Sequence, residues 1–174
     1  AVLGMGIGLW GQERYADEIF SGVTVTEDVV FSSNFGAADL AIDGNIFGAN
    51  PWSGANLQHT QTESQPWWML ELGGQAELQA VKLYNRSNCC QNRMSNFYVF
   101  VSETPLNPNE SIEELKTAAT AYEYVAGKMG SMGSYSFAGN TARYVLVKLT
   151  ERNPLHMAEV EVYGCLSGAR PPAH

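Results

Sequence analysis

Five short segments of this chain alternate apolar and polar side chains, and this period of two restricts the fold more than any other feature. The segments are rich in β-branched and aromatic residues and are separated by Gly, Asn, Pro or Ser. Successive side chains of a strand point to opposite faces, so each segment has one face to bury. The pattern predicts an all-β fold, an antiparallel β-sandwich. The five segments are Trp67–Leu72, Leu78–Tyr84, Asn96–Val101, Arg143–Leu149 and Ala158–Tyr163.

One stretch departs from this period and favours a short helix. Ser111 and Glu114 have the spacing of a capping box, in which each side chain binds the backbone N–H of the other residue. Good helix formers follow over Leu115–Tyr122. We therefore expect one or two helical turns on a surface connection between strands.

Length and composition indicate one globular domain with short ends. The chain has 174 residues, enough for a single domain with a substantial core. We assign residues 1–21 to an N-terminal extension and residues 22–165 to the domain. Residues 166–174 contain a Pro-Pro pair and are assigned to a C-terminal tail or linker. The first ten residues lack a basic start and do not resemble an intact signal peptide.

The acidic character of the chain excludes several kinds of partner. The formal net charge is −8, with only ten lysines and arginines. A sequence-independent nucleic-acid binder needs a dense basic face, so no nucleic acid is expected as a partner. Broad attraction to an acidic membrane is disfavoured for the same reason. No apolar run reaches the roughly 18 residues that cross a bilayer, so direct membrane insertion is not expected either.

Two adjacent cysteines, Cys89 and Cys90, lie between Arg86 and Arg93. Adjacent Cα atoms are about 3.8 Å apart, whereas disulfides usually span roughly 4.4–6.8 Å. The pair is therefore either two reduced thiols or a strained eight-membered ring, which would present a rigid, flat, apolar surface. A zinc site is disfavoured because ligand pairs normally have a spacer of about two to four residues. The remaining cysteine, Cys165, does not complete a disulfide framework.

The two arginines suit the recognition of hydroxyl groups. Each guanidinium is a planar fork of donors that stays charged at any working pH. If one strand ends near Asn85 and the next begins near Asn96, both arginines lie in one loop at one end of the sandwich, where binding sites collect. The alternative is a pair of solvated surface side chains. Donors beside an apolar plate describe a sugar site better than a catalytic one.

Other polar residues are ambiguous when taken singly. His59 and His156 each fit a surface or structural role. Asp43-Gly44-Asn45, with Glu159 and Glu161, offers oxygen ligands for calcium, although Asp-Gly-Asn is also an ordinary turn sequence. The chain contains no nucleophile, metalloprotease or phosphate-loop motif, and no spacing indicates a glycosidase carboxylate pair. We therefore expect no enzymatic activity.

Taken together, these residues resemble the F-type lectins (fucolectins), which share a jelly-roll sandwich with discoidin and coagulation-factor type C domains. The family signature is His, 26 residues, Arg, one residue, Asp, four residues, then Arg or Lys. This chain has His59, Arg86, Asn88 and Arg93 in those positions, with the Cys-Cys pair inside the last interval. The resemblance covers roughly residues 22–164. It includes Ala41-Ile42-Asp43-Gly44-Asn45, Pro66-Trp67-Trp68, Asn85-Arg86, Arg143-Tyr144-Val145, Leu155-His156 and Glu159-Val160-Glu161-Val162.

The resemblance implies a secreted, non-catalytic lectin domain that binds terminal L-fucose of fucosylated glycans. Its implied sugar contacts come from His59, Arg86 and Arg93, which would hydrogen-bond the fucose hydroxyls and ring oxygen. A Cys89–Cys90 disulfide would pack against the sugar ring. Trp52 lies near the family aromatic that contacts the C6 methyl group.

The resemblance also implies a structural calcium ion (Ca2+). Asp43 and Glu159 would bind it through their side chains. Further oxygen ligands would come from Leu40, Asn45, Asn56 and Ala158.

One position departs from the signature, because Asn88 stands where the family has an acid that braces an arginine. A neutral amide makes a weaker hydrogen bond than a carboxylate, so affinity or fine specificity should differ from that of acid-bearing relatives.

Two alternative functions remain open at this point. One is a discoidin-type adhesion module that binds protein or phospholipid. The other is a carbohydrate-binding module from a larger glycan-active enzyme or toxin. Either kind of domain could also form oligomers.

Overall fold

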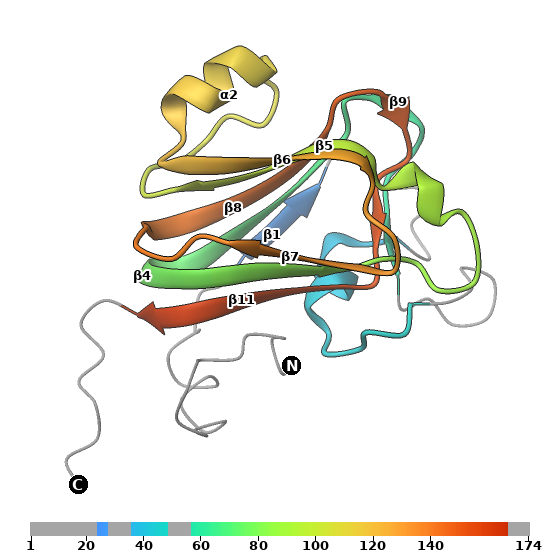
Figure 1. The fold of residues 1–174 in the computed structure, drawn as a ribbon, viewed down its shortest axis with the longest axis horizontal. Coiled ribbons are helices and arrows are strands. Elements are labelled where there is room, and N and C mark those ends of the chain that lie inside the picture. Colours follow the sequence, from blue (N-terminus) through green and yellow to red (C-terminus); the bar gives the residue numbers. More distant parts are fainter. Residues whose placement is uncertain (1–23, 28–35, 49–56, 167–174) are drawn as a thin grey trace, which may run out of the picture.

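Strand β4 (Trp67–Tyr84) runs through both layers of a β-sandwich, and the other strands are arranged around it (Figure 1). Near its start, β4 pairs with β1 (Thr24–Glu27) and β8 (Thr141–Leu149). Near its end it pairs with β7 (Met132–Ser136) and β11 (Glu159–Leu166). All of these pairs are antiparallel, so the all-β antiparallel sandwich predicted from the sequence is confirmed.

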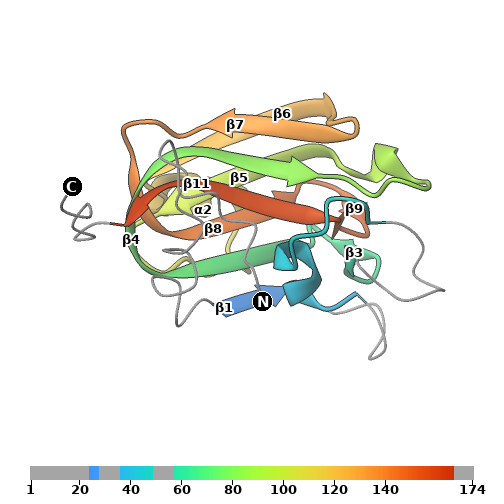
Figure 2. The ribbon, with the colours of Figure 1, turned by 90° about the horizontal axis from the view of Figure 1, so that it is seen from below.

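The larger layer has the strand order β1-β4-β8-β5-β6. It is completed by β5 (Ser95–Ser102) and β6 (Ala121–Lys128), and Figure 2 shows β1 and β6 at its opposite edges. The structure, a computed structural model, describes residues 24–27, 36–48 and 57–166. The predicted N-terminal extension and most of the predicted tail lie outside these residues.

Apolar side chains on the inner faces of the two layers form the main core. Val145 and Val147 of β8 are fully buried, as is Val160 of β11, and Val162 is nearly so. They pack with Trp68, which is also fully buried. Burial of one such side chain contributes about 1.5–3 kcal/mol, so the alternating pattern specifies both the strands and their inward faces.

The two predicted segments Trp67–Leu72 and Leu78–Tyr84 form one continuous strand. The residues between them include Gly73, whose φ of 78° lies in the left-handed region that glycine tolerates. The register between β4 and β8 shifts between Glu71 and Ala76. The glycines therefore mark an irregularity within the strand, where it passes from one layer to the other, and not a loop.

The predicted helix of one or two turns is confirmed. Helix α2 (Ile112–Ala118) begins after Ser111, and the capping box between Ser111 and Glu114 is complete. The helix formers that follow it do not all join the helix, because Tyr122 belongs to β6. There its ring packs against Tyr98 and Phe100 of the neighbouring strand, and this tertiary contact outweighs local helix propensity.

Several short elements gather at the end of the sandwich that lies opposite α2 (Figure 1). They comprise the paired strands β2 (Gln58–His59) and β10 (His156–Met157), the paired strands β3 (Glu63–Ser64) and β9 (Arg152–Asn153), and the 3-10 turns η1 (Ala38–Ile42) and η2 (Gln91–Arg93). This end carries the residues predicted for the site. Among the described residues, no helix is long and apolar enough to cross a lipid bilayer.

Candidate functional site

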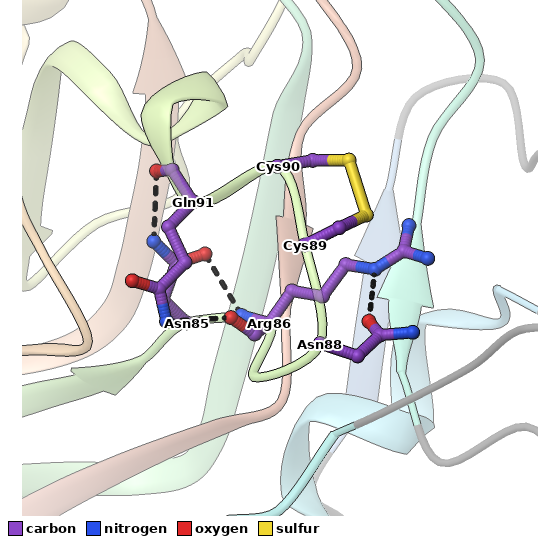
Figure 3. Close-up of a disulfide and its surroundings, with 6 residues drawn as sticks. All are labelled: Asn85, Arg86, Asn88, Cys89, Cys90 and Gln91. Atoms are coloured by element: carbon purple, nitrogen blue, oxygen red, sulfur yellow. Dashed lines mark hydrogen bonds between the residues drawn. A yellow bond between two sulfur atoms is a disulfide. The ribbon is translucent and has the colours of Figure 1, made fainter.

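The loop that follows β4 is held in shape by the side chain of Asn85. Its Nδ2 donates to the carbonyls of Gln91, at 2.9 Å, and Gly130, at 2.8 Å. Its Oδ1 accepts from the backbone N–H of Arg86 at 2.8 Å, and Gln91 Nε2 donates back to the Arg86 carbonyl at 3.0 Å (Figure 3). Asn85 is 2% exposed, so these bonds are sheltered from water. The loop therefore presents its functional side chains from a rigid frame.

Cys89 and Cys90 form a disulfide at the tip of this loop (Figure 3). Of the two alternatives that the sequence left open, the closed ring is therefore the one found. Cys90 has a φ of 62°, a left-handed conformation that reverses the chain before η2. Cys89 is exposed and Cys90 is half-buried, so the ring offers an apolar surface to a ligand.

Arg86 extends beside the disulfide and is held by Asn88. Arg86 Nε donates to Asn88 Oδ1 at 2.7 Å (Figure 3). Only 7% of Arg86 is exposed. Burial and the nearby positive charge of Arg93 lower its pKa from the ordinary value. Within the described part of the chain, its two Nη groups have no hydrogen-bond partner and remain available as donors.

Arg93 lies at the end of η2 and supplies a second guanidinium. Its backbone N–H donates to the Cys90 carbonyl at 3.1 Å, which ties it to the disulfide turn. In residues 24–27, 36–48 and 57–166, the Arg93 side chain forms no ion pair or hydrogen bond. Its positive charge acts on His59, Arg86 and His156, so the four side chains form one electrostatic cluster.

His59 reaches the same cluster from the short strand β2. Its backbone N–H donates to the Gly36 carbonyl at 3.0 Å. Gly36 has a φ of 96°, and a Cβ there would lie 2.6 Å from the His59 carbonyl oxygen, so only glycine allows this approach. His59 itself is 4% exposed.

The hydrogen bond of the His59 ring determines its chemistry. Nδ1 lies 2.6 Å from the Thr60 carbonyl oxygen, which only accepts, so Nδ1 carries the proton. Burial lowers the pKa of His59 from 6.5; the Thr60 bond opposes this, and Arg93 and Arg86 lower the pKa further. In the neutral ring that this favours, Nε2 is an acceptor. The cluster thus combines two donor forks with one acceptor.

His156 packs against the ring of His59, a contact that the sequence did not reveal. The two residues are direct partners in the β2–β10 pair, and their rings meet edge to face with centroids 5.4 Å apart. His156 is fully buried, and neither ring nitrogen forms a hydrogen bond within the described residues. Burial, with the charges of His59, Arg93 and Arg86, lowers the pKa of His156 to about 3. It therefore stays neutral and adds no charge to the cluster.

The predicted metal ligands Asp43 and Glu159 also lie together. Glu159 Oε2 accepts from the Gly44 N–H at 3.1 Å, whereas the buried Oε1 has no partner in the described part of the chain. Burial, together with the hydrogen bond and charge of Asp43, raises the pKa of Glu159 to about 8. Two carboxyl groups in such contact, one with an orphaned oxygen, form an arrangement that a cation would relieve.

The other predicted metal ligands are only partly placed. Asn45 follows Asp43, and its backbone N–H donates to Asp43 Oδ1 at 2.8 Å. Ala158 precedes Glu159 directly, and Leu40 belongs to η1, which packs against β11. Among the described residues, no three His, Cys, Asp or Glu side chains converge on one point, so backbone oxygens would have to complete a metal site. Asn56 and Trp52 lie outside the described residues.

A family model described as a NedA-like, galactose-binding domain matches residues 40–147. Fucolectin-6 of Anguilla japonica is 28% identical over 134 residues, which cover 76% of this chain and 66% of the fucolectin. The chain thus spans slightly less than two thirds of the length of that relative.

Solved structures agree with this match. A fucose-binding module of Streptococcus pneumoniae superposes with a TM-score of 0.67 at 31% identity, covering 83% of this chain and 92% of the module. The lectin domain of lectinolysin, solved in complex with Lewis B antigen, gives a TM-score of 0.68 at 30% identity, covering 83% of this chain and 94% of that domain.

Proposed function

Since this chain belongs to the NedA-like, galactose-binding domain family and is an F-type lectin domain, we propose that it binds terminal L-fucose of fucosylated glycans without catalysing a reaction. The relatives support this, because they are named as fucolectins, fucose-binding modules and a lectin domain. The single observation that carries the proposal is the convergence of Arg86, Arg93 and His59 beside the Cys89–Cys90 disulfide.

The chemistry of the cluster matches that of fucose. A six-deoxy sugar has hydroxyl groups and a ring oxygen on one part of its surface and an apolar methyl corner on another. The guanidinium N–H groups donate to sugar oxygens, and Nε2 of neutral His59 accepts from a hydroxyl. The apolar disulfide packs against the C–H face of the ring. We assign these contacts to His59, Arg86, Arg93 and the Cys89–Cys90 pair.

Discrimination follows from the cost of unpaired polar groups. A sugar that lacks one of the required hydroxyls leaves a donor or acceptor in the site without a partner, at a cost of about 1–3 kcal/mol. A single shallow site of this kind gives modest affinity, and tighter binding comes from several copies acting together. Oligomerisation, or a place within a longer chain, would provide such copies.

We also propose that Ca2+ occupies the cluster around Glu159. Side chains of Asp43 and Glu159 would bind it, with oxygen atoms of Leu40, Asn45, Asn56 and Ala158. The orphaned Oε1 of Glu159 and the raised pKa of its carboxyl group support this assignment. A bound Ca2+ would neutralise the two carboxylates and fix the segment before Gly48, whose carbonyl accepts hydrogen bonds from Ser87 in the sugar-binding loop.

The disulfide supports a secreted location, since such bonds persist mainly in oxidising compartments. Its place among the candidate contacts also means that reducing conditions would alter the site.

Isothermal titration with methyl α-L-fucoside tests the proposed function directly. Binding with one site per chain, together with no binding of methyl β-D-glucoside, is the expected result. Binding to phospholipid vesicles or to a protein ligand that free L-fucose does not displace would instead indicate a discoidin-type adhesion module.

A further inference from the structure

The electrostatic cluster of His59, Arg86, Arg93 and His156 carries positive charge that no described carboxylate balances. Arg86 and Arg93 are both permanently charged, and the side chain that braces Arg86 is the neutral Asn88. The ion pairs of the described residues are elsewhere: Lys116 pairs with Glu113, and Arg143 pairs with Glu71. Neither involves the cluster.

The electrostatic neighbours of the cluster lead to the same conclusion. The charges that shift the pKa of His59, Arg86 and His156 all come from other members of the cluster, and none is a carboxylate. Conversely, the charges that shift the pKa of Glu159 come from Asp43 and Glu161, and neither arginine contributes. No carboxylate is therefore among the charges that shift the pKa values of the cluster.

This local charge opposes the character of the whole chain, which has a formal net charge of −8. At physiological ionic strength, the field of an exposed charge fades over about 8 Å. A ligand group next to the arginines therefore responds to them and not to distant surface carboxylates.

The available hydrogen-bonding groups are also unequal. Arg93 and the two Nη groups of Arg86 supply only donors, and they have no partners within the described residues. A neutral hydroxyl accepts hydrogen bonds but also has a proton to donate, which needs an acceptor of its own. Sulfate and carboxylate groups only accept hydrogen bonds. An anionic oxygen beside fucose would use donors that a neutral glycan leaves with water, and hydrogen bonds of this charged kind are roughly twice as strong as neutral ones.

We propose that this site prefers fucosylated glycans that carry an anionic group, sulfate or carboxylate, on a sugar adjoining fucose. The inference rests on the proposed fucose site and specifies its class of ligand. The fucose itself occupies the cluster, and the anionic group lies at its rim, close to the unpaired arginine donors.

Calorimetric titrations with three matched glycans test this preference. They are one neutral fucosylated trisaccharide, the same trisaccharide with a sulfate on its galactose, and the form with sialic acid on that galactose. In about 0.1 M NaCl, where the Debye length is about 10 Å, we expect at least one anionic form to bind about two- to fivefold more tightly than the neutral form. In about 1 M NaCl, where the Debye length is about 3 Å, the preference should shrink. Whichever of the sulfated and sialylated trisaccharides binds more tightly than the neutral one shows whether the site prefers sulfate or carboxylate.

Asn88→Asp places a carboxylate next to Arg86, and a second variant controls for net charge. We expect the ratio of anionic to neutral affinity to fall toward one in Asn88→Asp. Asn109→Asp adds the same charge at an exposed position near α2, at the other end of the sandwich, and should keep the wild-type ratio.

Three results would overturn the inference. They are equal affinity of all three glycans at about 0.1 M salt, an unchanged ratio in Asn88→Asp, and equally tight binding of the sulfated glycan without its fucose. The wild-type measurements decide the question even if a variant fails to fold. Failure of methyl α-L-fucoside to bind at all would count against the proposed function itself, so the two failures can be told apart.

Discussion

Arg86 and Asn88, two residues apart in one loop, are joined by a hydrogen bond of 2.7 Å from the guanidinium Nε to the amide Oδ1. This bond orients the guanidinium, so that its outer Nη groups remain available to a ligand. Because the acceptor is a neutral amide, the bond lacks the extra strength of a pair of opposite charges. The position of Arg86, and with it the affinity of the site, should therefore depend on the residue at position 88.

Substitution of Asn88 tests this dependence with the neutral ligand. We expect Asn88→Asp to bind methyl α-L-fucoside about two- to tenfold more tightly, since a charged acceptor holds Arg86 more firmly. Asn88→Ala removes the acceptor and should weaken binding by a similar factor. Both affinities come from isothermal titration. Equal affinity of the three proteins would mean that Asn88 does not position Arg86.

The Cys89–Cys90 disulfide should matter for binding more than for stability. Closing a ring between neighbouring residues removes little freedom from the unfolded chain, so its loss should shift Tm only slightly. Its loss should nevertheless free the turn that supports Arg93 and remove the apolar plate, which lowers fucoside affinity by about tenfold or more.

The double variant Cys89→Ser/Cys90→Ser, compared with the parent by calorimetry and thermal melting, checks this expectation. The parent and the double variant should both carry Cys165→Ser, because Cys165 is an exposed free thiol that could form disulfides between chains. A large drop in Tm with unchanged affinity of the folded fraction would assign the disulfide a structural role only.

The sequence was sufficient to predict the parts of this site that are local in the chain. Arg86, the cysteine pair and Arg93 lie in one loop because the strands on either side are readable from their alternation. The closed state of the cysteines was not readable from spacing alone, because the short Cα separation argues against an ordinary disulfide. Family resemblance, and not periodicity, indicated the contribution of His59.

Residues joined by tertiary contacts could not be predicted in the same way. His156 meets His59 only because β10 pairs with β2, and two-residue strands carry no periodic signal. Strand β6 was not predicted because most of its side chains, including its tyrosines, are exposed and give no clear alternation. It is held in the sheet by its pairing with β5. Glycine is required at position 36 because of its positive φ and because a Cβ there would lie 2.6 Å from the His59 carbonyl oxygen, a contact made across the fold.

Fucoside affinity should fall in acid because His59 must be neutral to accept a hydrogen bond. Its pKa lies below 6.5, so the affinity should be constant between about pH 8 and 6.5 and decline at lower pH as the ring gains a proton. Arg86 and Arg93 act on the ring through their positive charge, and the Thr60 carbonyl accepts from Nδ1. His156, with a pKa of about 3, stays neutral over this range.

Titration at several pH values checks this expectation, and His59→Gln is the matched control, because glutamine retains an acceptor that does not titrate. An affinity that rises in acid, or an identical pH dependence in His59→Gln, would contradict the role given to His59.

Calcium should stabilise the wild-type domain through Glu159. We expect chelation to lower Tm by several degrees and about 1 mM Ca2+ to restore it, since a ligand that binds only the folded state stabilises it by mass action. Glu159→Gln should abolish this response. Glu161→Gln, on the same strand, should keep it, because the Glu161 carboxylate accepts from Tyr163 and is not assigned to the ion. A Tm that is independent of calcium would refute the metal assignment.

The central claim is that Arg93, beside the disulfide, binds fucose. The most direct measurement is calorimetric titration of methyl α-L-fucoside into the wild type, Arg93→Ala and Arg143→Ala. Arg143 is the matched control, because it is paired with Glu71 on β4 and takes no part in the cluster. We predict that Arg93→Ala weakens binding about 30-fold or more, as expected for loss of charged hydrogen bonds, while Arg143→Ala stays within about twofold of the wild type. Equal affinity of Arg93→Ala and Arg143→Ala would contradict the account.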